Sequence, residues 1–133
     1  MGPEVIEYGG KRFAEIIRKD VQTDTTKFFS PAESSLQFGL LAHKAGFTEK
    51  PHFHKPIKRL IDDLQQMFVV QKGKVLVQFF ADSGDLLGEA TLEEGDSILL
   101  IQGAHAIKAI EDMQCLSVKQ GPFLGNENDK AEI

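Results

Sequence analysis

After residue 34, apolar and polar residues alternate along most of the chain, which is typical of half-buried β-strands. In "LQFGLLAH", the apolar side chains of Leu36, Phe38 and Leu40 fall on one face. Turns are predicted at "ADSGD" and "EEGD". Further strands are predicted over "MFVVQ", "KVLVQFFA", "LLGEATL", "SILLI", "GAHAIKAI" and "MQCLSVKQ". Many short strands at near-regular spacing predict an antiparallel sandwich or barrel.

The segments before residue 35 are less regular. Residues 11–21 fit either a helix, with Phe13, Ile16 and Ile17 on one face, or a short strand. Residues 23–35 are predicted to form a loop that Pro31 interrupts. The predicted core is mainly aliphatic and aromatic, and consists of Phe68, Val70, Val75, Val77, Phe79, Ile98, Leu100 and Ile107.

Length, charge and cysteine content narrow the class of protein. The 133 residues suffice for one domain, and the net charge of −5 argues against nucleic-acid binding. No apolar run is long enough to cross a membrane, and the N-terminus lacks the features of a secretory signal. Cys115 is the only cysteine, so an intrachain disulfide and a multi-cysteine zinc site are excluded. These features predict a cytoplasmic protein in a reducing environment.

The pair His52 and His54 is the first candidate for chemistry. In a strand, residues two apart point to the same side, so both imidazoles would reach one metal ion. Two ligands leave a metal under-coordinated, and further ligands must come from elsewhere. The alternative is a pair of surface histidines on the edge of a loop.

The residues around this pair occur in a familiar order. Gly46 precedes the histidines, Gln66 stands seven residues before Gly73, and Gly95, Gly103 and His105 follow. This order, spanning about residues 36–120, resembles the cupin superfamily, whose two motifs combine glycines with His-x-His, a glutamate and a later histidine. The resemblance implies an all-β, double-stranded β-helix (jelly-roll) cupin barrel that holds a metal and a ligand inside. His105 would be the third imidazole.

The resemblance also implies a division of the chain. Residues 1–34 would pack on the barrel, 35–122 would form it, and 123–133 would be a polar tail. The chain departs from the motifs where eleven residues separate His54 from Gln66, and where Ile101 replaces the proline. We expect the long loop, residues 55–65, to cover one end of the barrel as a mobile lid.

Gln66 occupies the glutamate position of the first motif. A neutral amide oxygen leaves a divalent metal its full charge, which weakens metal binding and strengthens the attraction for an anionic ligand. The predicted metal ligands are thus His52, His54, Gln66 and His105. The alternative for Gln66 is an amide that lines the core without touching metal. This nitrogen-rich set suits a divalent transition metal: zinc, iron, nickel, copper, cobalt or manganese.

Three cations follow the histidines. Lys55, Lys58 and Arg59 are candidates for binding a phosphate or carboxylate, or they are solvated charges that balance Asp62 and Asp63. His43 is predicted to face solvent at a strand end. Cys115 is predicted to be buried rather than reactive.

Several functions remain open at this point. "HFHKP" and "VKQGPF" make the chain similar to small cupins of bacterial surface-polysaccharide and sugar-nucleotide pathways. That resemblance implies a homodimer that binds, and in some cases converts, a small polar or anionic, sugar-like molecule. A metal-dependent isomerase or epimerase is favoured over an Fe(II)-type dioxygenase, and a non-catalytic metabolite-binding module is the alternative. Tyr8, the only tyrosine, lies far in sequence from every motif.

Overall fold

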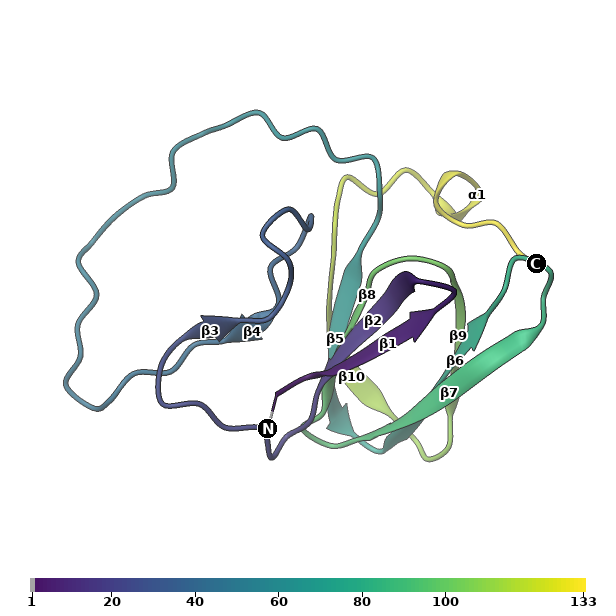
Figure 1. Ribbon diagram of the computed structural model, residues 1–133, viewed down its shortest axis with the longest axis horizontal. Coiled ribbons are helices and arrows are strands. Elements are labelled where there is room, and N and C mark those ends of the chain that lie inside the picture. Colours follow the sequence, from purple (N-terminus) through teal and green to yellow (C-terminus); the bar gives the residue numbers. More distant parts are fainter. Residues whose placement is uncertain (1) are drawn as a thin grey trace.

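The computed structural model describes residues 2–133, and strands dominate its regular structure (Figure 1). The larger sheet has the order β1-β2-β8-β5-β10, with antiparallel neighbours throughout. Its strands are β1 (Glu4–Tyr8), β2 (Lys11–Ile17), β5 (Gln66–Lys72), β8 (Ser97–Leu100) and β10 (Gln114–Lys119). The smaller antiparallel sheet, β7-β6-β9, contains β6 (Lys74–Phe80), β7 (Leu86–Glu93) and β9 (Ala104–Ala109). The remaining elements are β3 (Lys27–Phe28), β4 (Gly39–Leu40) and α1 (Asn126–Asp129).

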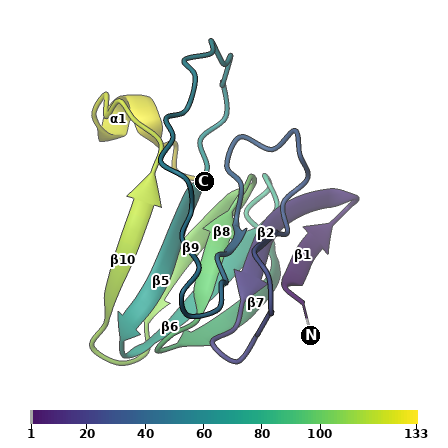
Figure 2. The ribbon, with the colours of Figure 1, turned by 90° about the vertical axis from the view of Figure 1, so that its left-hand side faces the viewer.

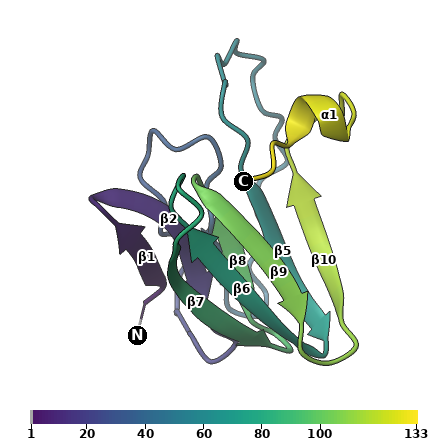
Figure 3. The same ribbon diagram turned by 90° about the vertical axis from the view of Figure 1, so that its right-hand side faces the viewer.

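One hydrophobic core lies between the two sheets and makes them a sandwich (Figure 3). Phe68, Ile16 and Ile98 enter it from the larger sheet, and Phe79 and Leu92 from the smaller one. The predicted core is buried at every position except Ile107, which is 43% exposed. The predicted all-β class with antiparallel sheets is therefore confirmed.

The predicted closed barrel is not seen among residues 2–133. β9 and β10 follow each other in the chain, yet they lie at the margins of different sheets, so the sandwich stays open between them (Figure 3). Residues 11–17 form a strand, because β2 lies between β1 and β8 and buries both of its faces. The first 34 residues thus supply two strands of the larger sheet, while the predicted division at residues 34 and 122 stays a prediction.

A flap, residues 27–40, covers part of the outer face of the larger sheet. β3 pairs with β4 in it, and Phe38 packs against Ile17 and Leu99 of the sheet. Glu15, only 1% exposed, lies under the flap, where Arg12 Nη1 and Ser30 Oγ donate hydrogen bonds to its carboxylate at 2.7 Å and 3.0 Å. The flap is therefore attached by apolar packing and by a satisfied buried carboxylate.

The arm, residues 41–64, links the flap to β5 and contains no helix or strand. It forms a wide arc that stands off from the sandwich (Figures 1 and 2). Among residues 2–133, no helix is both long enough and apolar enough to cross a membrane.

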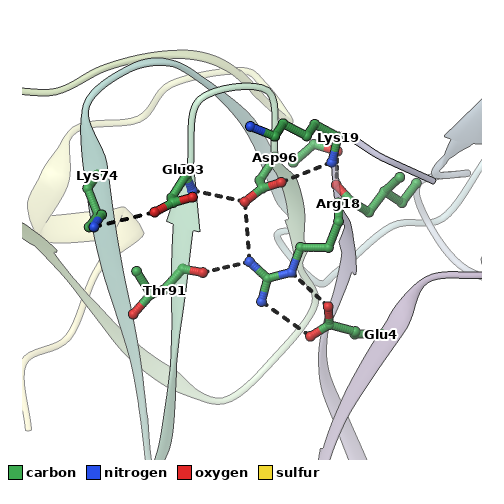
Figure 4. Close-up of polar contacts among 9 residues, drawn as sticks. Glu4, Arg18, Lys19, Lys74, Thr91, Glu93 and Asp96 are labelled. Atoms are coloured by element: carbon green, nitrogen blue, oxygen red, sulfur yellow. Dashed lines mark hydrogen bonds and ion pairs between the residues drawn. The ribbon is translucent and has the colours of Figure 1, made fainter.

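An ion network joins the N-terminal strands to the β7–β8 turn (Figure 4). Arg18 Nε donates to Glu4 at 2.7 Å, and its Nη1 donates to the Thr91 carbonyl at 2.6 Å and to Asp96 at 3.3 Å. The hydrogen bond to Glu4 is the main cause that raises the pKa of Arg18, so the guanidinium stays charged. The network therefore links the larger sheet to β7 of the smaller one.

Candidate functional site

A cavity of about 770 Å³ opens at one end of the sandwich. Gln66 at the start of β5, Phe80 at the end of β6 and His105 near the start of β9 line it, so both sheets contribute. Leu64 at the end of the arm and residues 129–133 of the chain's last segment complete the lining. Two of the four predicted metal ligands therefore meet in one cavity.

The pairing of β9 with β6 directs His105 into the open side of the sandwich. His105 pairs with Phe79, and Ile107 pairs with Val77, and both partners are core residues. Side chains directly opposite on paired strands share a face, so His105 and Ile107 face the sandwich interior. They remain exposed because β9 is an edge strand, with no neighbour on its other side among the described residues.

The pKa of His105 is lowered from its ordinary value of 6.5. Desolvation inside the cavity is the main cause and outweighs a backbone hydrogen bond with Gly103, which acts in the opposite direction. The positive charge of Lys130 lowers the pKa further. His105 is still an exposed residue, so a ligand can reach it. The imidazole is therefore neutral at pH 7, with a lone pair available for a metal or a hydrogen-bond donor.

We predict that Lys130→Ala raises the pKa of His105, because it removes a nearby positive charge. An NMR titration of the imidazole protons measures the change. Lys108→Ala is the control, since Lys108 lies on the same strand, β9, and pairs with Leu76. A His105 that titrates identically in both variants and the wild type would refute this assignment.

Because the pKa is lowered on folding, His105 contributes stability that is present above pH 6.5 and decreases as the pH falls toward its folded pKa.

Gln66 lies across the cavity on the larger sheet. Its amide Nε2 donates to Ser117 Oγ at 2.9 Å, and Ser117 Oγ donates to the Met67 carbonyl at 3.2 Å. The amide carbonyl oxygen is thus the Gln66 atom left to meet a metal or ligand. Gln65, only 2% exposed, makes different contacts, since its backbone N–H donates to Gln120 Oε1 at 2.7 Å.

His52 and His54 lie side by side on the arm, with their ring centroids 5.4 Å apart. The Nε2 of His52 is 3.1 Å from Glu49, and its Nδ1 is 2.9 Å from the Lys50 carbonyl. His52 and His54 lie outside any strand, and neither histidine lines the cavity of His105. Within residues 2–133, no three His, Cys, Asp or Glu side chains are grouped to hold a metal. The predicted four-ligand set is therefore split between the arm and the cavity.

The three candidate ligand-binding cations also lie on the arm. Lys55, Lys58 and Arg59 are exposed and line neither the cavity of His105 nor a second cavity beside β10. The predicted lid over residues 55–65 is not seen, because Leu64 alone of this segment lines the cavity of His105, and residues 61–64 border the second cavity, which has a volume of about 780 Å³. His43 is exposed, as predicted, and its ring stacks on Phe47 with centroids 4.0 Å apart.

Sequence reasoning missed one contributor to the core and one to the cavity. Tyr8 is remote from every motif in the sequence, yet its ring packs edge-on against Phe13 at 5.3 Å and lies 6.2 Å from Phe79. The sequence signal was the Gly9–Gly10 pair, which is typical of a two-residue hairpin turn. Both glycines have positive φ and join β1 to β2. Residues 129–133 reach the cavity through tertiary packing, for which the sequence carries no local signal.

Cys115 is partly buried against the core, as predicted, and burial raises the pKa of its thiol. A raised pKa lowers the thiolate fraction at pH 7, which argues against a nucleophilic role.

Comparison of the chain with protein-family models, with curated proteins and with solved structures found no match. The function is therefore argued from the cavity and its residues.

Proposed function

We propose that the protein is a cupin-type β-sandwich that binds a small polar or anionic, sugar-like metabolite together with a divalent transition metal. One observation carries this proposal: His105 and Gln66, from opposite sheets, line the same 770 Å³ cavity. A cavity of this size suits a small metabolite, and a few convergent polar groups orient such ligands. A neutral imidazole and an amide oxygen are both suitable metal ligands.

The glycine framework supports the cupin relationship. The four glycines of the two motifs all have positive φ, at 92°, 87°, 90° and 83° for Gly46, Gly73, Gly95 and Gly103. Only glycine adopts this conformation without strain, so each of these positions requires the residue that the cupin pattern places there. A jelly-roll arrangement with the β9–β10 side closed is part of this proposal.

The arm would supply the other two ligands. Leu64, at its end, lines the cavity, and His54 stands ten residues before it. An extended chain spans about 3.3 Å per residue, so this length reaches about 33 Å and lets the arm fold back over the opening. A metal at His105 would therefore order the arm by recruiting His52 and His54. Lys55, Lys58 and Arg59 follow them directly and would bring positive charge to an anionic metabolite.

The chemistry of such a site follows from its charge. Three imidazoles and an amide leave a bound metal its full divalent charge, which polarises a carbonyl or hydroxyl group. The Tyr8 hydroxyl lies against Gly88 in the sandwich, so it offers no base at the cavity. Binding alone, as an accessory module, and metal-dependent isomerisation or epimerisation are both consistent with the site, and Fe(II)-type oxygenation is the less favoured alternative. We place the protein in the cytoplasm, where a lone thiol stays reduced.

Metal titration tests the proposal. We expect wild-type protein, purified without a metal-affinity column, to bind one Zn²⁺ or Ni²⁺ in calorimetric titrations. His105→Ala and the double variant His52→Ala/His54→Ala should each bind at least about 100-fold more weakly, equivalent to about 2.8 kcal/mol. His43→Ala is the matched control, because His43 lies on the same arm and stacks on Phe47. It should bind like the wild type.

Two outcomes would contradict the proposal. Unchanged metal affinity in His105→Ala would show that any bound metal is held outside the cavity. Unchanged metal affinity in the double variant would show that His52 and His54 are not metal ligands. If metal binds as expected, a screen of sugar-like metabolites with the metal-loaded protein separates the two roles: binding without turnover identifies a module, and turnover identifies an enzyme.

A further inference from the structure

The arm exposes more apolar surface than a free segment normally does. Its most exposed apolar side chains are Leu60 at 99%, Phe53 at 83% and Leu41 at 78%. Ile57, Phe47, Leu64 and Ile61 are exposed at 64%, 56%, 44% and 43%. Isolated apolar side chains are common on surfaces, but seven on one 24-residue segment mark an interaction site.

An apolar surface of the same chain is also partly uncovered. The outer face of β5 and β10 carries Leu116 opposite Val69 and Val118 opposite Met67. Leu116 and Val118 are 56% and 54% exposed, although they continue the sheet face whose other half the flap buries. We call these four residues the β10 face. β10 is the edge strand of this sheet, and Figure 2 shows it at the margin opposite β1.

Charge separates the arm from the rest of the chain. The arm holds five Lys or Arg and three Asp or Glu, a net charge of +2. The remaining residues hold the other 10 basic and 17 acidic side chains, a net charge of −7. The arm and the body of the protein therefore attract each other, which favours contact between the arm and a second copy's body.

The available area matches a stable complex. If a whole phenylalanine or leucine-sized residue presents about 200 Å², the exposed fractions of the seven arm residues amount to roughly 900 Å² per chain. That is about what each partner buries in a standard-size protein interface. The chain's own arm leaves the β10 face uncovered: it is fixed at one end by β4 and at the other by the buried Gln65, and it arcs outward between them.

We propose that the arm docks on the β10 face of a second copy, and that the exchange is reciprocal. Each chain then donates an arm and receives one, which gives a closed twofold dimer with two equivalent arm–face contacts. Apolar contacts exclude water from Phe53, Leu60 and the β10 face, and the opposite net charges of arm and body attract the two partners to each other. The inference does not rest on the metal proposal. Phe53 lies between His52 and His54, so docking on a second copy and metal binding at the chain's own cavity are two alternative positions of the arm.

Multi-angle light scattering and sedimentation equilibrium, with EDTA present, test the exchange. We expect a wild-type dimer at micromolar concentration. The arm variant Phe53→Asp/Leu60→Asp and the face variant Leu116→Asp/Val118→Asp should each dimerise at least about 100-fold more weakly. Leu86→Asp is the matched control, since Leu86 is an equally exposed leucine, at 53%, on β7. It should remain dimeric.

Mixing the two folded, monomeric variants distinguishes exchange from other dimers. In a reciprocal exchange, the intact arm of the face variant can still dock on the intact face of the arm variant. Differently tagged variants should therefore form a heterodimer, held by one of the two contacts, that neither variant forms alone. Circular dichroism confirms that each variant is folded. A monomeric wild type, an open-ended oligomer, or no heterodimer from two folded variants would each overturn the exchange.

Discussion

Replacing Asp96 with alanine should lower the free energy of unfolding by about 3 kcal/mol, among the largest effects of any single polar substitution in this chain. Asp96 is 5% exposed, and its carboxylate accepts hydrogen bonds from the backbone N–H groups of Lys19 and Glu93, both at 2.9 Å. It also accepts from Arg18 Nη1 at 3.3 Å (Figure 4). Alanine would leave two backbone donors and a guanidinium without their acceptor.

Urea unfolding followed by circular dichroism measures this effect, and thermal unfolding should show a decrease in Tm of roughly 10 °C. Asp82→Ala is the control, because Asp82 is an exposed aspartate in the turn between β6 and β7. Its substitution should change stability by less than about 0.5 kcal/mol. Equal effects from both substitutions would show that Asp96 does not tie the β7–β8 turn to the end of β2.

Gly73→Ala should destabilise the protein by about 3 kcal/mol or more, because two costs add at this position. Gly73 joins β5 to β6 with φ at 87°, a conformation that costs an L-residue about 1–2 kcal/mol. A Cβ atom there would also overlap the backbone carbonyl of Asp112, which lies in the β9–β10 connection. Because backbone is less able to move aside than a side-chain end, the connection itself must shift.

Gly84→Ala separates the two causes. Gly84 has φ at 94° in the hairpin between β6 and β7, but no heavy atom lies within 4 Å of the position that a Cβ atom would take there. This control should therefore lose only the conformational part, about 1–2 kcal/mol. If denaturant unfolding gives the same loss for both variants, close packing at Gly73 contributes nothing. The difference between the two variants also concerns the candidate site. Asp112 belongs to the connection between β9 and β10, the two strands that border the open side of the sandwich.

Local patterns account for most of the strands. Alternation predicts β6, because Val75, Val77 and Phe79 face the core at every second position. Glycine at the expected turns is confirmed by the positive φ of Gly84 and Gly95. The Gly9–Gly10 pair would have predicted the β1–β2 hairpin on the same grounds, and would have settled residues 11–17 as a strand.

The candidate site was predictable only in part. The motif order singled out Gln66 and His105, and the structure places both at one cavity. It also singled out His52 and His54, whose rings are adjacent but lie on the arm. Adjacency within one segment is a local property, whereas a shared position with His105 depends on where the arm packs. The metal site therefore stays a prediction.

The sequence by itself determined the strands from β5 onward and their turns, because side-chain alternation and glycine conformation act over a few residues. The strand predicted over "LQFGLLAH" forms only at Gly39–Leu40. Tertiary structure alone decided which strands became edges. Ile107 has the apolar character of a core residue, yet it is exposed because β9 ends the smaller sheet. Asp96 and Glu15 have the polarity of surface residues, yet they are buried because donors from other segments of the chain satisfy them. Strand order, edges and buried polar partners arise from contacts between remote segments, and no local pattern encodes these contacts.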